Sequence, residues 1–378
     1  ILARALEIPA VLSIEGVASS LKNGDTVVVD GSEGAVIVNP DDNTVAEYSK
    51  KRDAFLAERK ELENYRGRET KSASGEVYEL FCNIGKPEDA VKAVDADGEG
   101  VGLFRTEFLF MDRTSIPTED EQFEAYKKAA LILKGKSLII RTLDIGGDKD
   151  IPYLGLEKEE NPFMGFRAIR YCLKNRELFK SQIKAILRAS AFGDIKIMFP
   201  LITTMDELRE GKKLVAECKA DLRNMGINFN ENIQVGVMVE TASAAVIADM
   251  LAKEADFFSI GTNDLTGYTM ACDRGNNDVS YLYSPLQPSV LRMIKRTIEC
   301  GVQNGISVGM CGEAAANKLM IPLLISFGLT EFSVSAPSVL NVRKIISTWT
   351  KEEADKVTAK VLEMSTQQEI VEYLKSVV

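Results

Sequence analysis

The stretch IKIMFPLITTMDELREGKKLVAECKADLRNMGINFNENIQVGVMVE, residues 195–240, contains a complete strand–helix–strand unit. Residues 195–199 and 233–239 are apolar runs of strand length, whereas residues 205–224 between them are amphipathic and long enough for a helix. Strands that alternate with helices pair in parallel, because the helix carries the chain back to the edge where the first strand began. This unit therefore predicts a parallel sheet covered by helices.

The same alternation runs along the chain from about residue 75. A second amphipathic stretch, residues 119–133, predicts another helix of this kind. Eight runs are candidate strands: 79–82, 100–104, 137–140, 164–166, 195–199, 233–239, 257–260 and 307–310. Eight such units over about 300 residues have the size of a (β/α)₈ TIM barrel, with an open doubly wound sheet as the alternative. We expect the α/β barrel.

The N-terminal part has a different pattern. Two β-branched runs, residues 26–30 and 35–38, predict a hairpin. The spacing of Thr44 and Glu47 is that of a capping box, and it predicts a helix over 43–66 that ends before Gly67. We therefore expect three parts: a β-rich piece over 1–42, a helical linker over 43–70, and the barrel over 71–378.

Charge and composition exclude several classes of function. Lys and Arg total 46 against 56 Asp and Glu, so the net charge of −10 argues against a general nucleic-acid binder and against binding to anionic membranes. Histidine is absent, which excludes any mechanism that needs an imidazole from within this sequence. The longest uncharged apolar run, 319–329, is too short to span a bilayer.

The six cysteines and the start of the chain bear on its origin. No two cysteines form a C-x-x-C motif, and a chain of this length needs no disulfides to hold a core, so we expect reduced thiols and a cytoplasmic protein. No signal peptide is present. The sequence opens at Ile1 without Met, and we expect a fragment of a longer protein.

A barrel places its chemistry on the residues that follow each strand, because these line its C-terminal mouth. Three arginines, two acids, two amides, a proline and a thiol occupy such positions: Asn83, Arg105, Arg141, Arg167, Pro200, Glu240, Asn263, Asp264 and Cys311. We expect the polar members of this set to face one mouth.

The three strand-end arginines suggest an anion site. Each could instead form a separate salt bridge, with Glu107 and Asp144 as nearby partners. Three guanidinium groups at equivalent positions favour a shared anion, and their forked geometry fits phosphate and carboxylate. A small phosphorylated acid is the expected ligand.

The two acids suggest a metal. Glu240 and Asp264 follow neighbouring strands, where they could simply neutralise the arginines. Mg²⁺, however, usually takes one or two protein carboxylates and completes its coordination with water and substrate oxygens. We expect a magnesium site.

Two further features remain open at this level. Lys149, in the run Gly146-Gly-Asp-Lys149, could reach an anion or could be a solvated turn lysine. Cys311 could be a buried apolar residue or, in a pocket without histidine, a proton donor.

Four longer motifs point to a family. They are Gly102-Leu-Phe-Arg-Thr-Glu-Phe-Leu-Phe-Met-Asp-Arg113, Arg141-Thr-Leu-Asp-Ile-Gly-Gly-Asp-Lys149, Asn161-Pro-Phe-Met-Gly-Phe-Arg-Ala-Ile-Arg170 and Ile260-Gly-Thr-Asn-Asp-Leu-Thr266. The chain resembles enzyme I of the bacterial sugar phosphotransferase system over essentially its whole length. The resemblance implies transfer of phosphate from phosphoenolpyruvate (PEP) to a histidine and then to the carrier protein HPr, with Mg²⁺ as cofactor and a homodimer formed through the barrel.

The resemblance also implies a role for each site residue. Arg105, Arg141 and Arg274 match the PEP-binding arginines, and Arg167 lies in an element that lines the same pocket. Asn263 and Asp264 match a pair that contacts substrate, Glu240 and Asp264 match the magnesium ligands, and Cys311 matches the proton donor.

The acceptor histidine of the family lies just before the element that here is Ile1-Leu-Ala-Arg-Ala-Leu6. The resemblance therefore implies that residues 1–42 are the end of the phosphohistidine domain, and that the part which docks HPr lies upstream. Three places depart from the family pattern, Gly267, Tyr281 and the run from Cys311 to Ala316, and they bear on loop shape and substrate affinity. Two alternatives stay open: another Mg²⁺-dependent barrel enzyme of small keto acids, such as an aldolase or lyase, and a non-catalytic fragment for dimerisation and ligand binding.

Overall fold

The computed structural model describes residues 8–12, 14, 16–111, 113–146 and 151–378. Its internal contacts divide the chain into two compact units, Ile1–Arg68 and Glu69–Val378. Each unit is described by itself. In the described part of the chain, no helix is both long enough and apolar enough to cross a membrane.

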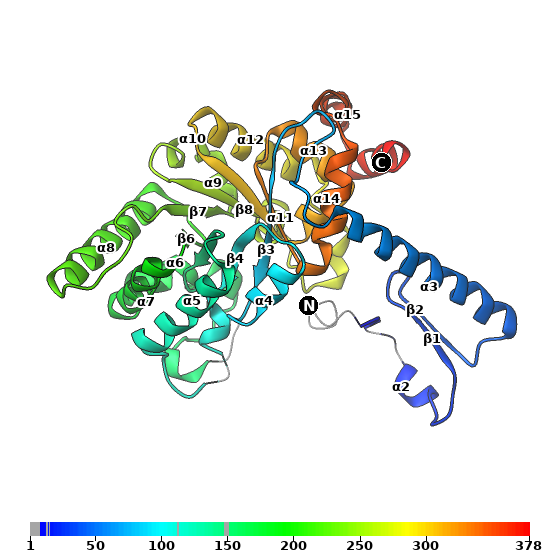
Figure 1. Ribbon diagram of the computed structural model, residues 1–378, viewed down its shortest axis with the longest axis horizontal. Helices are drawn as coiled ribbons and strands as arrows, with labels where there is room; N and C mark the ends of the chain where they lie inside the picture. The colour runs from blue at the N-terminus through cyan, green and yellow to red at the C-terminus, as the bar shows by residue number, and fades with distance from the viewer. Residues whose placement is uncertain (1–7, 13, 15, 112, 147–150) are drawn as a thin grey trace. The chain divides into compact units, whose positions relative to one another are not determined.

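The first unit contains the predicted hairpin and the predicted helix (Figure 1). Strands β1 (Val27–Asp30) and β2 (Ala35–Val38) pair antiparallel, with Asp30 opposite Ala35. A short helix, α2 (Val17–Ser20), precedes them, and α3 (Asp42–Leu62) with the 3₁₀ turn η1 (Glu63–Tyr65) follows. The existence of both elements is confirmed.

The start of α3 differs from the prediction. Its N-cap is Asp41, whose carboxylate accepts a hydrogen bond from the Thr44 backbone N–H at 2.7 Å, and not Thr44 itself. An aspartate caps a helix at least as well as a threonine, and Asp41 is the first such residue after Pro40. The expected capping box of Thr44 and Glu47 is therefore wrong, because both residues already lie inside the helix.

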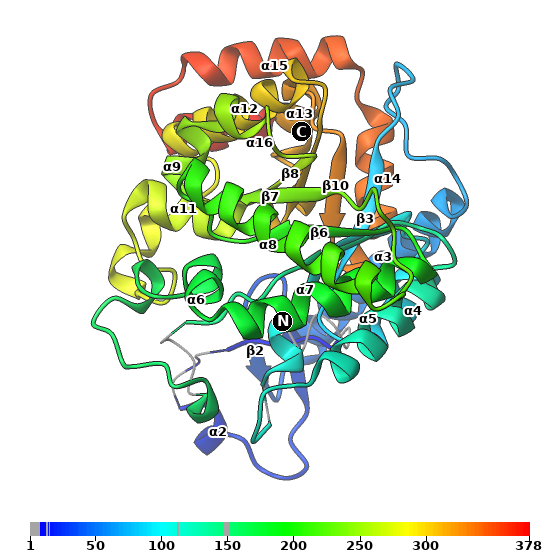
Figure 2. The ribbon, with the colours of Figure 1, turned by 90° about the vertical axis from the view of Figure 1, so that its left-hand side faces the viewer.

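The second unit is a closed barrel of eight parallel strands, in the order β10-β3-β4-β5-β6-β7-β8-β9 (Figures 1 and 2). Its strands are β3 (Glu79–Ile84), β4 (Gly100–Arg105), β5 (Leu138–Arg141), β6 (Ile195–Phe199), β7 (Val235–Val239), β8 (Phe257–Gly261), β9 (Ser307–Cys311) and β10 (Glu331–Val334). The TIM barrel is confirmed, and closure through β10 excludes the open sheet.

One of the eight predicted strands is wrong. Residues 164–166 overlap the 3₁₀ turn η4 (Pro162–Met164), because a proline locks the backbone φ near a helical value and offers no N–H to a strand ladder. The missing eighth strand is β10, which the sequence analysis did not recognise. Two of its four residues, Glu331 and Ser333, are polar, whereas a buried barrel strand is expected to be apolar.

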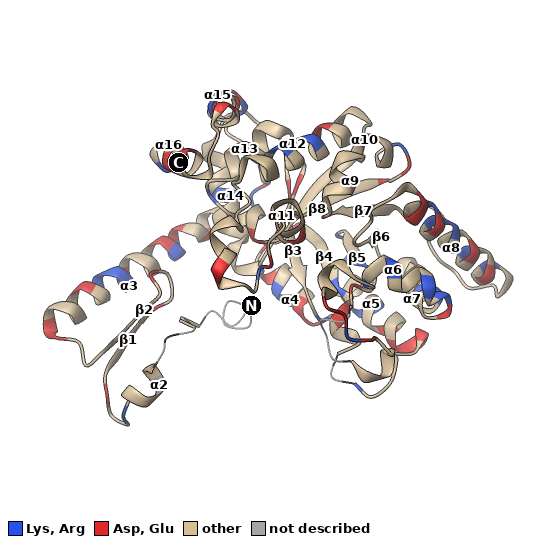
Figure 3. Cartoon of the chain, turned by 180° about the vertical axis from the view of Figure 1, so that it is seen from behind, with Lys and Arg blue, Asp and Glu red and all other residues tan. Residues whose placement is uncertain are grey.

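Helices surround the barrel, and α5 (Glu119–Leu133) and α8 (Met205–Asn224) have the predicted bounds. Both begin with a capping box, formed by Thr118 and by Thr204. Acidic and basic residues are interspersed along α8 (Figure 3). The remaining helices are α4 (Asp89–Asp95), α6 (Ala168–Lys174), α7 (Arg176–Ala189), α9 (Ala242–Val246), α10 (Ala248–Leu251), α11 (Thr262–Met270), α12 (Pro288–Gln303), α13 (Ile321–Phe327), α14 (Val339–Thr348), α15 (Lys351–Glu363) and α16 (Gln367–Val377).

Short 3₁₀ turns complete the unit: η2 (Thr106–Leu109), η3 (Pro152–Leu154), η5 (Ser190–Phe192), η6 (Asn277–Leu282), η7 (Glu313–Ala316) and η8 (Ala336–Ser338). The larger core lies between the barrel and its helices, and a smaller one fills the barrel interior. The interior cluster consists of Leu103, Ile139, Met198, Met238, Phe257 and Cys311. All six cysteines are buried free thiols, as expected.

Candidate active site

Two of the predicted arginines end neighbouring strands. Arg105 is the last residue of β4 and Arg141 the last of β5, and the two stand opposite each other in the ladder. Arg167 follows no strand, because residues 164–166 form none, and it lies instead at the N-terminus of α6. It still reaches the mouth, since its guanidinium lies 3.3 Å from the Asp264 carboxylate. Arg274 lies in the exposed loop after α11.

Arg141 is held by acids of its own chain. One guanidinium nitrogen lies 2.6 Å from the Glu107 carboxylate and another 3.0 Å from the Asp144 carboxylate. Burial works to lower the pKa of Arg141, but Glu107 and Asp144 outweigh it and raise the pKa above its ordinary value. The third nitrogen, Nε, is buried without a partner among the described residues, so the group retains an unused donor.

All three guanidinium nitrogens of Arg167 donate hydrogen bonds. Its Nε and one terminal nitrogen donate to Asp144 Oδ1 at 3.2 and 2.7 Å, and the other terminal nitrogen donates to the Tyr268 hydroxyl at 3.4 Å. The salt-bridge interpretation therefore holds for Arg141 and Arg167, with the partners considered from the sequence. Asp144 forms ion pairs with both arginines. From the sequence it is expected only as a salt-bridge partner, because it lies three residues after Arg141.

Arg105 differs from both. It is half-buried, and it has no hydrogen bond or ion pair within the described parts of the chain. Burial lowers the pKa of Arg105, and the nearby cations Arg141 and Arg274 contribute in the same direction. A desolvated cation without a carboxylate is costly unless an anion accompanies it. Arg105 is therefore the clearest candidate for an anion-binding group at the mouth.

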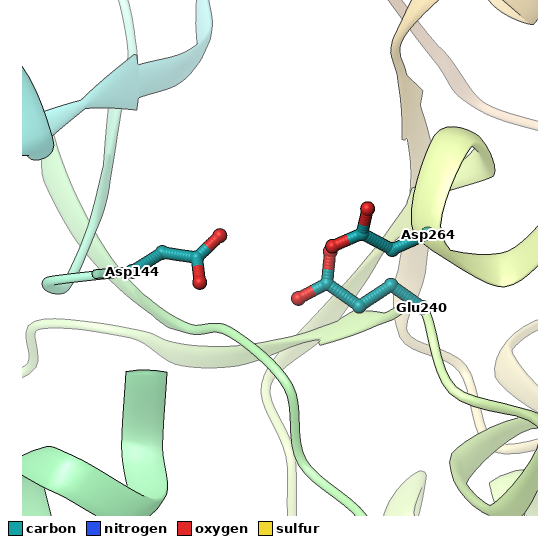
Figure 4. Close-up of side chains that lie close together, drawn as sticks. All are labelled: Asp144, Glu240 and Asp264. Atoms are coloured by element: carbon teal, nitrogen blue, oxygen red, sulfur yellow. The ribbon is translucent and has the colours of Figure 1, made fainter. Parts of the chain in front are cut away.

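Three carboxylates gather beside the arginines. Asp144, Glu240 and Asp264 each offer an oxygen, and these oxygens lie within 4.8 Å of one another (Figure 4). Glu240 follows β7 and Asp264 lies in the first turn of α11, after β8, and β7 pairs with β8 as predicted. Glu240 is held in place by the Leu201 backbone N–H, which donates to its carboxylate at 2.7 Å.

The charge of this cluster suits a cation. Burial raises the pKa of Glu240 well above its ordinary value, and Asp264 and Asp144 raise it further. A divalent cation would relieve that repulsion. Carboxylate oxygens are the ligands of hard cations such as Mg²⁺, so the donor set fits the expected metal and adds Asp144 as a third candidate ligand.

Cys311 ends β9 inside the barrel, and its thiol donates to the Ile260 carbonyl at a Sγ–O distance of 3.7 Å. Burial raises the pKa of Cys311 to about 11, so the thiol is protonated at neutral pH, which a proton donor requires. Gly312 follows with φ +110°, and a Cβ there would lie 2.7 Å from Thr262 Oγ1 and 3.8 Å from Asn263 Oδ1. Only a glycine adopts this backbone conformation easily and lets the end of β9 approach Thr262 so closely.

Other predicted and unpredicted residues complete the mouth. The Asn263 carbonyl accepts a hydrogen bond from Tyr283 at 2.9 Å. Tyr268 donates to the Phe163 carbonyl and so ties α11 to the segment before Arg167. Asn83 is used inside the barrel, where its side chain accepts from Ser333 Oγ at 2.7 Å. Lys149 lies outside the described residues.

Comparisons with known proteins agree with this geometry. The family model "PEP-utilising enzyme, PEP-binding domain" matches residues 59–350, and "PEP-utilising enzyme, mobile domain" matches residues 1–34. The chain is 51% identical to the phosphoenolpyruvate-protein phosphotransferase of Bacillus subtilis (strain 168) over 99% of its length. It is 47% identical to the enzyme of the same name from Staphylococcus carnosus (strain TM300), also over 99%.

The chain spans 66% and 65% of the lengths of these two relatives. Among solved structures, it is similar to protein CitE from Mycobacterium tuberculosis in complex with magnesium and pyruvate, at 15% identity and a TM-score of 0.40 over 75% of this chain and 96% of that chain. A likeness of that degree adds nothing to the assignment. The match of the PEP-binding domain covers most of the chain and the whole mouth described above, and the chain therefore belongs to the family of PEP-utilising enzymes.

Proposed function

We propose that the chain is the PEP-binding part of a phosphoenolpyruvate-protein phosphotransferase, enzyme I of the sugar phosphotransferase system. The observation that carries this proposal is that two groups lie at one mouth: the desolvated Arg105, which has no ion-pair partner among the described residues, and the cluster of Asp144, Glu240 and Asp264. A phosphorylated acid bound with Mg²⁺ satisfies both groups at once. The two curated relatives of that name support the choice of enzyme within the family.

Different residues of the mouth bind the substrate and the metal. Arg105, Arg141 and Arg274 bind the phosphate and carboxylate of PEP, with Arg167 and Asn263 lining the same pocket. Glu240 and Asp264 hold Mg²⁺, which when bound offsets negative charge on the substrate oxygens. Guanidinium groups fixed by Glu107 and Asp144 need no reorganisation as charge moves onto the leaving group.

The reaction breaks the bond between phosphorus and the enol oxygen of PEP, and the electron pair stays with the enolate of pyruvate. Cys311 then gives its proton to the methylene carbon, which completes pyruvate. The sequence contains no histidine, so the acceptor of the phosphoryl group is a residue outside it. We propose that residues 1–42 belong to the phosphohistidine domain, that 43–70 form a linker, and that 71–378 form the barrel.

The same proposal covers the partners. Phosphate would pass from the histidine to HPr, and the barrel would form a homodimer in the cytoplasm, without nucleic acid or membrane insertion.

Calorimetry and a coupled assay test the function. The 378-residue chain should bind PEP only when Mg²⁺ is present, and should accumulate no phosphoprotein. Addition of a separate polypeptide that carries the family's histidine segment should release pyruvate slowly, because the tether that raises the effective concentration is missing. Failure to bind PEP with Mg²⁺, or pyruvate release without phosphorylation of the added segment, would contradict the proposal.

A further inference from the structure

Glu331 is a buried acid that the proposed mechanism does not use. Its side chain points into the barrel, the residue is 5% exposed, and Oε1 has no hydrogen-bond partner among the described residues. A carboxyl group at such a position is expensive unless it stays protonated or has a function.

Two glycines make room for this carboxyl group. A Cβ on Gly102 would lie 2.3 Å from Glu331 Oε1, and a Cβ on Gly309 would lie 2.9 Å from its carboxyl atoms. Any side chain at either position would displace the acid. The carboxyl of Glu331 therefore occupies the interior space that these glycines of β4 and β9 leave free.

The strand register places the acid one row below the thiol. Glu331 stands opposite Gly309, and Gly309 stands opposite Ser259 in the next strand. One row nearer the mouth, Ser333 stands opposite Cys311. With no side chain on Gly309, nothing on β9 separates Glu331 from the space beneath Cys311.

Two hydroxyl groups lie between the two rows: Ser333 Oγ, which donates to Asn83, and Ser259 Oγ, which has no hydrogen-bond partner by distance among the described residues. Ser333 Oγ would lie 2.5 Å from the same Gly102 Cβ that Glu331 Oε1 approaches, so the hydroxyl and the carboxyl are close neighbours. Ser259 lies beside the Cys311 thiol and acts to lower its pKa. Serine hydroxyls both donate and accept, so they can pass a proton between the acid and the thiol.

The surroundings of Glu331 and Cys311 favour transfer of a proton from the Glu331 carboxyl group to the Cys311 thiolate. Glu79 stands opposite it on β3, and Lys196 is the nearby cation from β6. Burial raises the pKa of Glu331 to about 8, with Glu79 acting in the same direction and Lys196 opposing it. Because burial raises the pKa of Cys311 to about 11, a proton moves favourably from the Glu331 carboxyl to the Cys311 thiolate.

We propose that Glu331 returns a proton to Cys311 after each turnover, through the hydroxyls of Ser333 and Ser259. The inference rests on the function proposed above. The S–H bond of Cys311 breaks as the C–H bond of pyruvate forms; the O–H bond of Glu331 then breaks as the S–H bond re-forms. The Glu331 carboxylate recovers its proton from solvent at the N-terminal end of the barrel, where Glu79 is exposed. Glu331 contacts no substrate atom and is a positioning residue for the proton of the thiol.

Exchange of the pyruvate methyl hydrogens with D₂O, followed by proton NMR, tests this step without a phosphoryl acceptor. The 378-residue chain with pyruvate and Mg²⁺ should catalyse the exchange, and Cys311→Ala should abolish it. Glu331→Gln should slow it on the order of tenfold or more, as expected for loss of a proton-transfer group. Its thermal midpoint should not fall below that of the parent at neutral pH.

The pH profile separates the relay from a structural role. In exchange, Cys311 must first give up its proton, so the parent rate should rise as Glu331 ionises, with a midpoint near pH 8. Glu331→Gln should lack this rise. Glu79→Gln should move it to lower pH and Lys196→Gln to higher pH, because Glu79 raises the pKa of Glu331 and Lys196 lowers it.

The outcomes are distinguishable. Exchange that survives Cys311→Ala, or no exchange by the parent chain, overturns the proposed role of Cys311 and this inference with it. Exchange by Glu331→Gln at the parent rate, with the rise near pH 8 intact, overturns the relay alone. If Glu331→Gln does not fold, Ser333→Ala replaces it: a slower rate supports the relay, and an unchanged rate refutes it.

Discussion

Replacement of Glu331 by Gln should change how the stability of the barrel depends on pH. Burial raises the pKa of Glu331 to about 8 in the folded chain, against an ordinary value of 4.5. The folded state therefore binds this proton more tightly than the unfolded state does. The free energy of unfolding of the parent should fall as the pH rises from about 4.5 to about 8, and should be independent of this group above that pH.

The size of the effect follows from the two pKa values. At about 1.4 kcal/mol per pKa unit, the loss amounts to about 5 kcal/mol over the full range. Glutamine has no proton to lose, so Glu331→Gln should escape this loss. A buried amide without partners costs about 1–3 kcal/mol, but that cost does not vary with pH. The difference in stability between variant and parent should therefore grow by about 5 kcal/mol from pH 4 to pH 9.

Urea unfolding measures this difference. Trp349, the single tryptophan of the chain, lies in the barrel unit, so its fluorescence reports on the barrel alone. Melting curves of parent and variant at matched ionic strength, from acid to alkaline pH, give the two stability profiles. A difference that stays constant with pH would refute the reasoning, because it would show that Glu331 ionises as freely in the folded chain as in the unfolded one.

Four further changes test the mouth and the scaffold. Arg105→Ala should weaken PEP binding roughly thirtyfold by calorimetry, from loss of about 2 kcal/mol of charge-assisted contact, whereas the surface variant Arg223→Ala should bind normally. Glu240→Gln should abolish the Mg²⁺ dependence of PEP binding and the electron paramagnetic resonance signature of bound Mn²⁺; retention of both would make Glu240 a salt-bridge partner only. Cys311→Ala should bind PEP like the parent but form pyruvate about 10²–10⁴-fold more slowly with the histidine segment added, and an unchanged rate would make water the proton source. Thr204→Ala removes the capping box of α8 and should lower the free energy of unfolding by about 1 kcal/mol without a change in PEP affinity.

The barrel could be predicted because its strands and helices differ in period and length. The bounds of α5 and α8 follow from an amphipathic pattern that begins at a capping threonine, and both signals are local. β10 was missed for a non-local reason: Glu331 is tolerated inside the barrel only because Gly102 and Gly309 on other strands leave it space. The run Glu331-Phe-Ser-Val334 contains two polar residues, and its acid is expected to face solvent until those glycines are known to face it.

The site was predictable to a similar extent. Position after a strand identified Arg105, Arg141, Glu240 and Cys311, since parallel strands bring their ends to one mouth. Arg167 reached that mouth by a different route, through a 3₁₀ turn and the start of α6. The role of Tyr268 could not be predicted, because its hydrogen-bond partner Phe163 is 105 residues away in the chain and a single sequence does not show such a contact.

Asp144 has a consequence for how the mouth fills. One of its oxygens holds Arg167 and the other holds Arg141, while the carboxyl also belongs to the three-acid cluster. A cation coordinated by Asp144 would weaken the ion pairs of Asp144 with both arginines, and the arginines could then bind an anion. An anion that occupies the arginines leaves Asp144 in need of a cation. If PEP and Mg²⁺ bind as proposed, each should raise the affinity for the other, by the same factor in both directions. We therefore expect the mouth to bind the two together more tightly than either the anion or the metal alone.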